Sequence, residues 1–161
     1  MRIYVASSWR NPHQASVVAD LRRAGHLVYD FKHPHPDHRG FAWSEIDPAW
    51  GDWTPGQYRE ALMHPTAERG FSLDMDALVL ADACIFVAPA GRSAALELGY
   101  AVGRGKRTAA IIFPGQEPDL MFKMCDRVFT STEETRIWLA APHHPAPAKI
   151  SDIERAIGSF S

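Results

Sequence analysis

Two continuous apolar runs, Ala83 to Ala88 (ACIFVA) and Thr108 to Phe113 (TAAIIF), constrain the fold of this chain most strongly. A strand is apolar at every position when both faces of its sheet are covered, which is typical of parallel sheets flanked by helices. The segment between the runs, Ser93 to Val102, has the length and pattern of a single helix. The runs therefore predict a β-α-β unit at the centre of an α/β fold.

The segments around this unit repeat the alternation of strands and helices. Further strands are expected at Arg2 to Ala6, His26 to Phe31 and Arg127 to Thr130. Helices are expected from Pro12 to Ala24 with Asn11 as the cap, Thr54 to Leu62, Ala67 to Ala81, Pro118 to Met124, and Ser131 through Trp138. This order predicts one domain over residues 1–161, with about five parallel strands, helices on both faces, and a ligand site beyond the carboxyl ends of the strands. Residues 141–149 are interpreted as a proline-rich linker to a short C-terminal helix from Ser151.

Charge and composition exclude several classes of partner. The formal net charge is −2, from 17 Lys+Arg and 19 Asp+Glu without a block of like charge, so neither a nucleic acid polymer nor a membrane surface is expected to bind. No run approaches the ~18 apolar residues of a membrane-spanning helix, and the N-terminus lacks the apolar region of a signal peptide. The two cysteines, Cys84 and Cys125, lie far apart. We expect a reduced, cytoplasmic protein.

The segment Lys32 to Trp53 has neither a helical nor a strand pattern and is rich in Pro, His and Trp. A loop of this length inside a compact domain is usually functional. Its histidines, His33, His35 and His38, raise the question of a metal site. Because two prolines interrupt the cluster and no cysteine assists, we predict no metal and no cofactor.

The segment after the first apolar run carries the most informative carboxylate. A Gly-containing turn follows the buried strand, Ser93 is placed to cap the next helix, and Glu97 lies four residues later on the same helical face. Its neighbours on that face, Ala94 and Ala101, are small enough to leave room for a ligand above the carboxylate. On the residues alone, a ligand-facing Glu97 and an ordinary solvated glutamate remain open alternatives.

The wider pattern resembles a known family. Asp74 precedes Asp82 by eight residues, a buried strand follows, and the helix carries the sequence G-R-S-A-A-L-E-L-G-Y-A, while a tyrosine lies in the first strand. Over residues 2–140 this pattern is similar to the nucleoside 2-deoxyribosyltransferase superfamily, which includes related nucleotide N-glycoside hydrolases. The resemblance implies a flavodoxin-like three-layer sandwich and a homodimer or larger homo-oligomer. It also implies a nucleoside or nucleotide as the small-molecule partner.

The resemblance gives roles to three residues. Glu97 matches the nucleophile that attacks the anomeric carbon of the sugar, Asp74 the carboxylate that assists proton delivery to the departing base, and Tyr4 the residue that orients the nucleophile. Such chemistry is physically reasonable, because a carboxylate stabilises and captures the positive charge that develops on the sugar. A retaining mechanism places the two carboxyls ~5 Å apart. Asp76 and Asp82 are weaker candidates for the second carboxylate, because Asp76 faces another side of the helix.

This chain departs from the transferases at two places. No acid lies between Asp82 and Glu97, where the transferases carry one, and this absence favours hydrolysis over base exchange. The stretch LMFKMCDRVF lacks the asparagine that the transferases take from a neighbouring subunit, so no such contribution is expected from it. Ser93 instead resembles the serine with which the nucleotide hydrolases receive the 5′-phosphate at a helix N-terminus. The candidate phosphate-binding residues are Ser7, Ser8, Arg10, Gly91, Arg92 and Ser93. Ordinary loop capping by the two serines and solvated surface charges at the two arginines remain open alternatives.

Aromatic residues of the long loop are candidates for stacking on the base. We expect Trp43 and Trp53 to bind substrate, with Trp50 and Phe41 as further candidates, although loop tryptophans also serve as packing anchors. The alternative to an enzyme is a non-catalytic nucleotide-sensing domain on the same fold.

Overall fold

The computed structural model describes residues 1–35 and 39–142. Its centre is a parallel sheet of five strands in the order β2-β1-β3-β4-β5. The strands are β1 (Arg2–Ala6), β2 (Leu27–Tyr29), β3 (Ala83–Val87), β4 (Arg107–Ile111) and β5 (Arg127–Phe129). Every position of β3 and β4 is buried, as the apolar runs predict.

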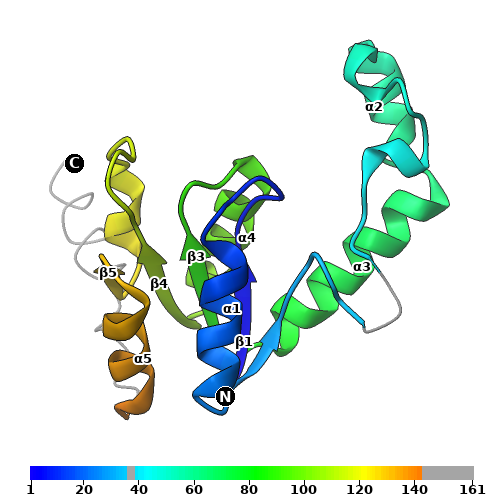
Figure 1. Cartoon of the computed structure of the whole chain (residues 1–161). Helices are drawn as coiled ribbons and strands as arrows, with labels where there is room; N and C mark the ends of the chain where they lie inside the picture. Colours follow the sequence, from blue (N-terminus) through cyan, green and yellow to red (C-terminus); the bar gives the residue numbers. More distant parts are fainter. Residues whose placement is uncertain (36–38, 143–161) are drawn as a thin grey trace, which may run out of the picture.

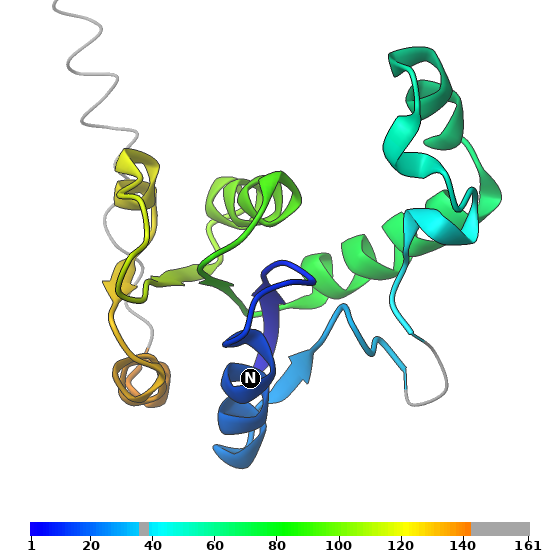
Figure 2. The same ribbon diagram turned by 45° about the horizontal axis from the view of Figure 1, so that its top comes forward.

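Helices cover both faces of the sheet (Figures 1 and 2). On one face, α1 (Gln14–Arg23) and α5 (Thr132–Ala140) bury Leu21 and Leu139 against β1, β3 and β4. On the other, α3 (Pro65–Leu80) and α4 (Arg92–Gly103) bury Leu78 and Leu98. The predicted flavodoxin-like α/β sandwich is confirmed.

The remaining helices lie outside these two layers. The short α2 (Pro55–Ala61) precedes α3 and lies far from the sheet (Figure 1). Three 3-10 turns, η1 (Trp43–Glu45), η2 (Trp50–Asp52) and η3 (Leu120–Met124), occupy the connections. The sequence predicts a short helix over residues 118–124, and the structure has the 3-10 turn η3 over Leu120–Met124, which starts after Asp119 because the Asp119 carboxylate caps it by accepting from the backbone N–H of Met121.

The connection after β1 is anchored by Asn11. Its side-chain amide donates to the carbonyls of Val87 (2.8 Å) and Pro89 (2.9 Å), which ties this loop to the loop after β3. Its Oδ1 accepts from the backbone N–H groups of His13 and Gln14, so α1 begins at Gln14 and not at Pro12 as predicted. One side chain thus holds together the two loops that follow the central strands.

The second strand is shorter than its apolar pattern predicts. β2 ends at Tyr29 because the carboxylate of Asp30 turns the chain, accepting hydrogen bonds from the backbone N–H of Lys32 and from the side chain of Gln14. The turn directs the long loop over the carboxyl edge of the sheet. Residues 143–161, which include the predicted C-terminal helix, lie outside the described residues.

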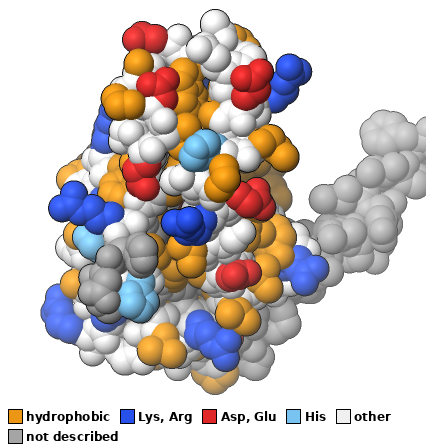
Figure 3. All heavy atoms as spheres, turned by 90° about the vertical axis from the view of Figure 1, so that its right-hand side faces the viewer, with side chains coloured by type: hydrophobic (Ala, Val, Ile, Leu, Met, Phe, Trp, Pro, Cys, Tyr) orange, Lys and Arg blue, Asp and Glu red, His pale blue; other side chains and the backbone are white. Residues whose placement is uncertain are grey.

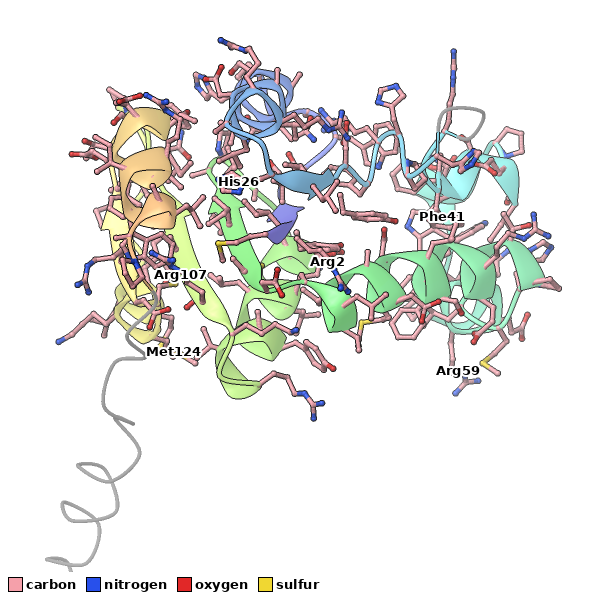
Figure 4. All side chains as sticks on the ribbon, turned by 90° about the horizontal axis from the view of Figure 1, so that it is seen from below. Arg2, His26, Phe41, Arg59, Arg107 and Met124 are labelled. Atoms are coloured by element: carbon pink, nitrogen blue, oxygen red, sulfur yellow. The ribbon has the colours of Figure 1, made fainter. Side chains whose placement is uncertain are left out.

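The long loop has its own aromatic cluster. The ring of Trp43 makes edge-on contacts with Phe41 (4.7 Å between centroids), Trp53 (5.6 Å) and Tyr58 (5.7 Å). Phe41 lies against α3 (Figure 4), where a Cβ on Gly70 would come within 2.6 Å of the Phe41 Cβ. The absence of a side chain at residue 70 therefore allows the loop to pack on α3.

The surface shows no large block of one charge on the side formed by α2 and α3 (Figure 3). Apolar, basic and acidic side chains alternate there, as the near-balanced composition of the chain leads one to expect. Within residues 1–35 and 39–142, no helix has the length and apolar character needed to cross a membrane.

Candidate active site

Glu97 lies on the second turn of α4, beyond the carboxyl end of β3. The residues beside it on the helix, Ala94 and Leu98, are buried in the core, and the Glu97 side chain is itself partly buried. Burial raises the pKa of Glu97 to about 7, and the nearby charge of Asp74 adds to this rise. A freely solvated glutamate has no such shift, so partial burial distinguishes Glu97 from an ordinary surface glutamate.

Asp74 approaches the same place from α3. It is partly buried, and burial raises the pKa of its carboxyl while a hydrogen bond from the Tyr29 hydroxyl (2.8 Å, Tyr29 Oη to Asp74 Oδ1) opposes the rise. Asp76 is exposed on another side of the helix, and Asp82 accepts a hydrogen bond from the backbone N–H of Arg2 at the start of the sheet. Of these three acids, Asp74 is the one that lines the same cavity as Glu97.

Tyr4 lies beneath the two carboxyls at the centre of β1, fully buried. Burial raises the pKa of its hydroxyl, with the charges of Glu97 and Asp74 as further causes, so the group stays protonated and able to donate. Among the described residues, the Tyr4 hydroxyl has no well-aligned hydrogen-bond partner. It nevertheless lies close enough to Glu97 to lower the pKa of that carboxyl. Tyr4 therefore has a donor available for the carboxylate of Glu97.

A cavity of about 660 Å³ opens above these acids at the carboxyl edge of the sheet, within the size range of small-molecule sites. Most of its polar lining comes from the loops after β1 and β3 and from the start of α4, with one serine from the long loop: Ser7, Ser8, Arg10, Ser44, Gly91, Arg92 and Ser93. Its aromatic lining comes from the loop after β1 and the long loop: Trp9, Phe31, Phe41, Trp43 and Trp50. Asp74 and Glu97 also line this cavity, so it combines acids, cations and aromatic rings.

The polar lining has two kinds of groups. The hydroxyls of Ser7 and Ser8 donate to the carbonyls of Val87 (3.0 Å) and Pro89 (3.5 Å), so they also stabilise the loops. Arg10 and Arg92 are exposed at the cavity, and in the described part of the chain neither pairs with a carboxylate. With the free backbone N–H groups at the start of α4, these cations form a region suited to an anion.

The structure does not place a metal-ligating cluster in this region. Within residues 1–35 and 39–142, no three His, Cys, Asp or Glu side chains gather as ligands. His33 instead lies 3.4 Å from the Asp30 carboxylate, and His38 is outside the described residues.

Comparisons of the sequence with protein family models and with curated proteins give no match. Solved structures, however, share the architecture. The 2-deoxyribosyltransferase of Bacillus psychrosaccharolyticus, 20% identical, aligns with a TM-score of 0.54 over 91% of this chain and 100% of its own. The chain has the fold of a 2-deoxyribosyltransferase.

Two further structures support the same fold. A CMP N-glycosidase of Clostridium botulinum is 13% identical, with a TM-score of 0.50 over 88% of this chain and 100% of its own. A conserved protein of Enterococcus faecalis V583 is 15% identical, with a TM-score of 0.53 over 84% and 94%. The predicted resemblance is thus confirmed at the level of the fold, and the chemistry must be inferred from the site.

On this deoxyribosyltransferase fold, the structure brings most of the predicted residues together. Tyr4 lies below the cavity, and Trp53 is outside it. The Trp53 indole donates to the Asp47 carboxylate (2.6 Å) and packs its ring on Trp43, so the predicted direct stacking of Trp53 on a base has no support. Trp53 is a packing anchor for Trp43, which does line the cavity.

Trp9, Phe31 and Tyr29 belong to the site but do not appear among the sequence predictions. Trp9 and Phe31 line the cavity and contact each other edge-on (5.6 Å between centroids), and Tyr29 binds Asp74. All three lie at or just after the carboxyl ends of β1 and β2, where ligands of parallel sheets bind. Position at the strand ends is therefore the signal that identifies them.

Proposed function

We propose that this protein cleaves the N-glycosidic bond of a nucleoside 5′-monophosphate or nucleoside, with Glu97 as the nucleophile. The observation that carries the proposal is the pair of partly buried carboxyls, Glu97 and Asp74, which come from different helices and line one cavity. The pKa values of both are raised, and such shifts cluster at catalytic sites. The shared fold with a deoxyribosyltransferase and a CMP N-glycosidase supports the same class of reaction.

The reaction proceeds in two steps that conserve atoms and charge. The ionised carboxylate of Glu97 attacks the anomeric carbon, the bond to the base breaks, and the protonated carboxyl of Asp74 gives its proton to the departing base. Water then attacks the anomeric carbon of the glycosyl ester, Asp74 takes a proton from that water, and the carboxylate of Glu97 is released. A second free base in place of water gives transfer.

The two carboxyls have protonation properties suited to these roles. Burial raises the pKa of both carboxyls, that of Glu97 to about 7, so the coupled pair retains a proton up to near-neutral pH. The productive arrangement has that proton on Asp74 and the negative charge on Glu97. The Tyr4 hydroxyl below Glu97 favours this arrangement by stabilising the ionised glutamate.

The cavity lining favours a phosphorylated substrate. Arg10, Arg92 and the start of α4 offer positive charge and N–H donors for a 5′-phosphate, while the ring of Trp43 and its aromatic neighbours offer stacking surfaces for a base. The transferases carry an acid that contacts the sugar shortly before the nucleophile, whereas this chain has Gly91-Arg92-Ser93 there. We infer that hydrolysis of a nucleotide is the main reaction and base exchange a secondary one.

The experiment is a panel of nucleosides and 5′-monophosphates, assayed for free base by chromatography, with binding measured by calorimetry. Wild type is expected to release base from at least one 5′-monophosphate, and Glu97→Ala is expected to lose about 10³-fold or more of that rate. Asp76→Asn, which changes an exposed carboxyl two residues from Asp74, is the matched control and should keep the wild-type rate.

A second candidate function has a distinct outcome in the same panel. A nucleotide sensor binds through Arg10 and Arg92 without releasing base, so wild type and Glu97→Ala would bind alike and neither would produce free base. A second free base added to the active reaction distinguishes transfer from hydrolysis by the appearance of a new nucleotide.

A further inference from the structure

Two tyrosines lie side by side below the candidate acids. Tyr4 of β1 and Tyr29 of β2 are directly paired in the parallel register, and their rings stack with centroids 5.3 Å apart and planes at 19°. Tyr4 faces Glu97, whereas the Tyr29 hydroxyl donates to Asp74. Each carboxyl therefore has its own tyrosine from a neighbouring strand.

The Tyr29–Asp74 hydrogen bond joins two elements that are 45 residues apart in the chain. Rotation about the last torsion of an aspartate is broad and has no sharp minima, so packing alone fixes a carboxyl plane weakly. The 2.8 Å hydrogen bond occupies Oδ1 and fixes that plane. Oδ2 is then the oxygen left for proton exchange with a ligand.

We propose, building on the proposed function, that Tyr29 is a positioning residue for the acid: its hydroxyl holds Asp74 Oδ1 so that Oδ2 exchanges the proton with the base. Tyr29 does not touch the reacting atoms in this arrangement. It acts through Asp74, and its ring stack on Tyr4 makes the two tyrosines one rigid support for both carboxyls.

The same hydrogen bond affects the protonation of the acid. Asp74 faces Tyr29 from β2, Tyr4 from β1 and Glu97 from α4; Asp30 lies near Tyr29, and Cys84 of β3 near Glu97. Donation from Tyr29 stabilises the ionised form and lowers the pKa of Asp74, against the rise that burial causes. Loss of that donor therefore raises the pKa of Asp74, and the charge of Asp74 is then neutralised at a higher pH.

The test is Tyr29→Phe, which keeps the ring and its stack on Tyr4 but removes the donor. We expect kcat to fall about 10-fold with KM changed less than about twofold, because orientation of the acid is lost and binding groups are untouched. The alkaline limb of the kcat/KM profile, where Asp74 loses its proton, should move to higher pH, because the hydrogen bond that stabilises the ionised carboxylate is lost. Tyr100→Phe, the same change on α4 away from the cavity lining, should move neither quantity.

Two further measurements separate failure of this inference from failure of the proposed function. Asp74→Asn removes the titrating acid, so adding Tyr29→Phe to it should produce no further shift of the profile. The carboxyl pKa of Asp74, followed by NMR in wild type and Tyr29→Phe, should rise in the variant whether or not any base is released. An active wild type with an unmoved profile and an unmoved Asp74 pKa in Tyr29→Phe overturns the role of Tyr29, while an inactive wild type overturns only the proposed reaction.

Discussion

Replacement of Glu97 by glutamine should stabilise the folded protein at alkaline pH. In the folded protein the pKa of Glu97 is about 7, against 4.5 for the free side chain. Because the folded pKa is raised, the unfolded chain loses this proton first, and stability falls as pH rises from about 4.5 to about 7. A shift of this size corresponds to about 3 kcal/mol, and glutamine keeps the shape without the charge.

The assay is thermal unfolding followed by circular dichroism at pH 5 and pH 8. At pH 8, Glu97→Gln should be more stable by about 1–3 kcal/mol, a rise in Tm of several degrees for a domain of this size. At pH 5 the gain should shrink, because Glu97 is then largely protonated in the folded protein. Glu117→Gln, at an exposed loop position, is the matched control and should show no such difference. An equal or absent gain at both pH values would refute the burial of Glu97 as the cause.

Further predictions concern the two linings of the cavity. Gly70→Ala forces the Phe41 side chain away from α3, because the new Cβ would lie 2.6 Å from the Phe41 Cβ; unfolding measurements should show a loss of about 1–3 kcal/mol and kinetics a raised KM. Gly99→Ala, where nothing lies within 4 Å of the new Cβ, should instead gain about 0.5–1 kcal/mol. Replacement of Arg10 or Arg92 by alanine should weaken calorimetric binding of a 5′-monophosphate about 10-fold and leave the nucleoside nearly unchanged; equal losses for both ligands would contradict a phosphate role.

The chain pattern predicts the central fold well because its strongest signals are local. The apolar runs at β3 and β4 indicate a sheet covered on both faces, and the same local pattern places Glu97 on the helix after β3, whereas its role comes from the family resemblance. The match of Asp74 to the second carboxylate comes from the family resemblance, and helical periodicity adds only that Asp76 faces another side of the helix, where it is exposed. The strand and helix signals depend on residues within one or two turns of one another.

Other features depend on contacts that no local pattern contains. The pairing of Tyr29 with Tyr4 requires the register of β1 and β2, and its hydrogen bond to Asp74 spans 45 residues. Trp53 and Trp43 look alike in sequence, but a hydrogen bond to Asp47 holds Trp53 away from the cavity. The carboxyl ends of the strands indicate which segments can line the cavity. Which side chains of those segments point into it depends on tertiary packing.

The central claim is that Glu97 forms a covalent bond to the sugar. Mass spectrometry of protein quenched in acid, after mixing with a 5′-monophosphate that the wild type cleaves, tests it most directly. We predict a mass increase equal to the sugar phosphate on the peptide that contains Glu97, and none in Glu97→Gln. Release of base with no adduct on that peptide, and with inversion at the anomeric carbon, would contradict the account.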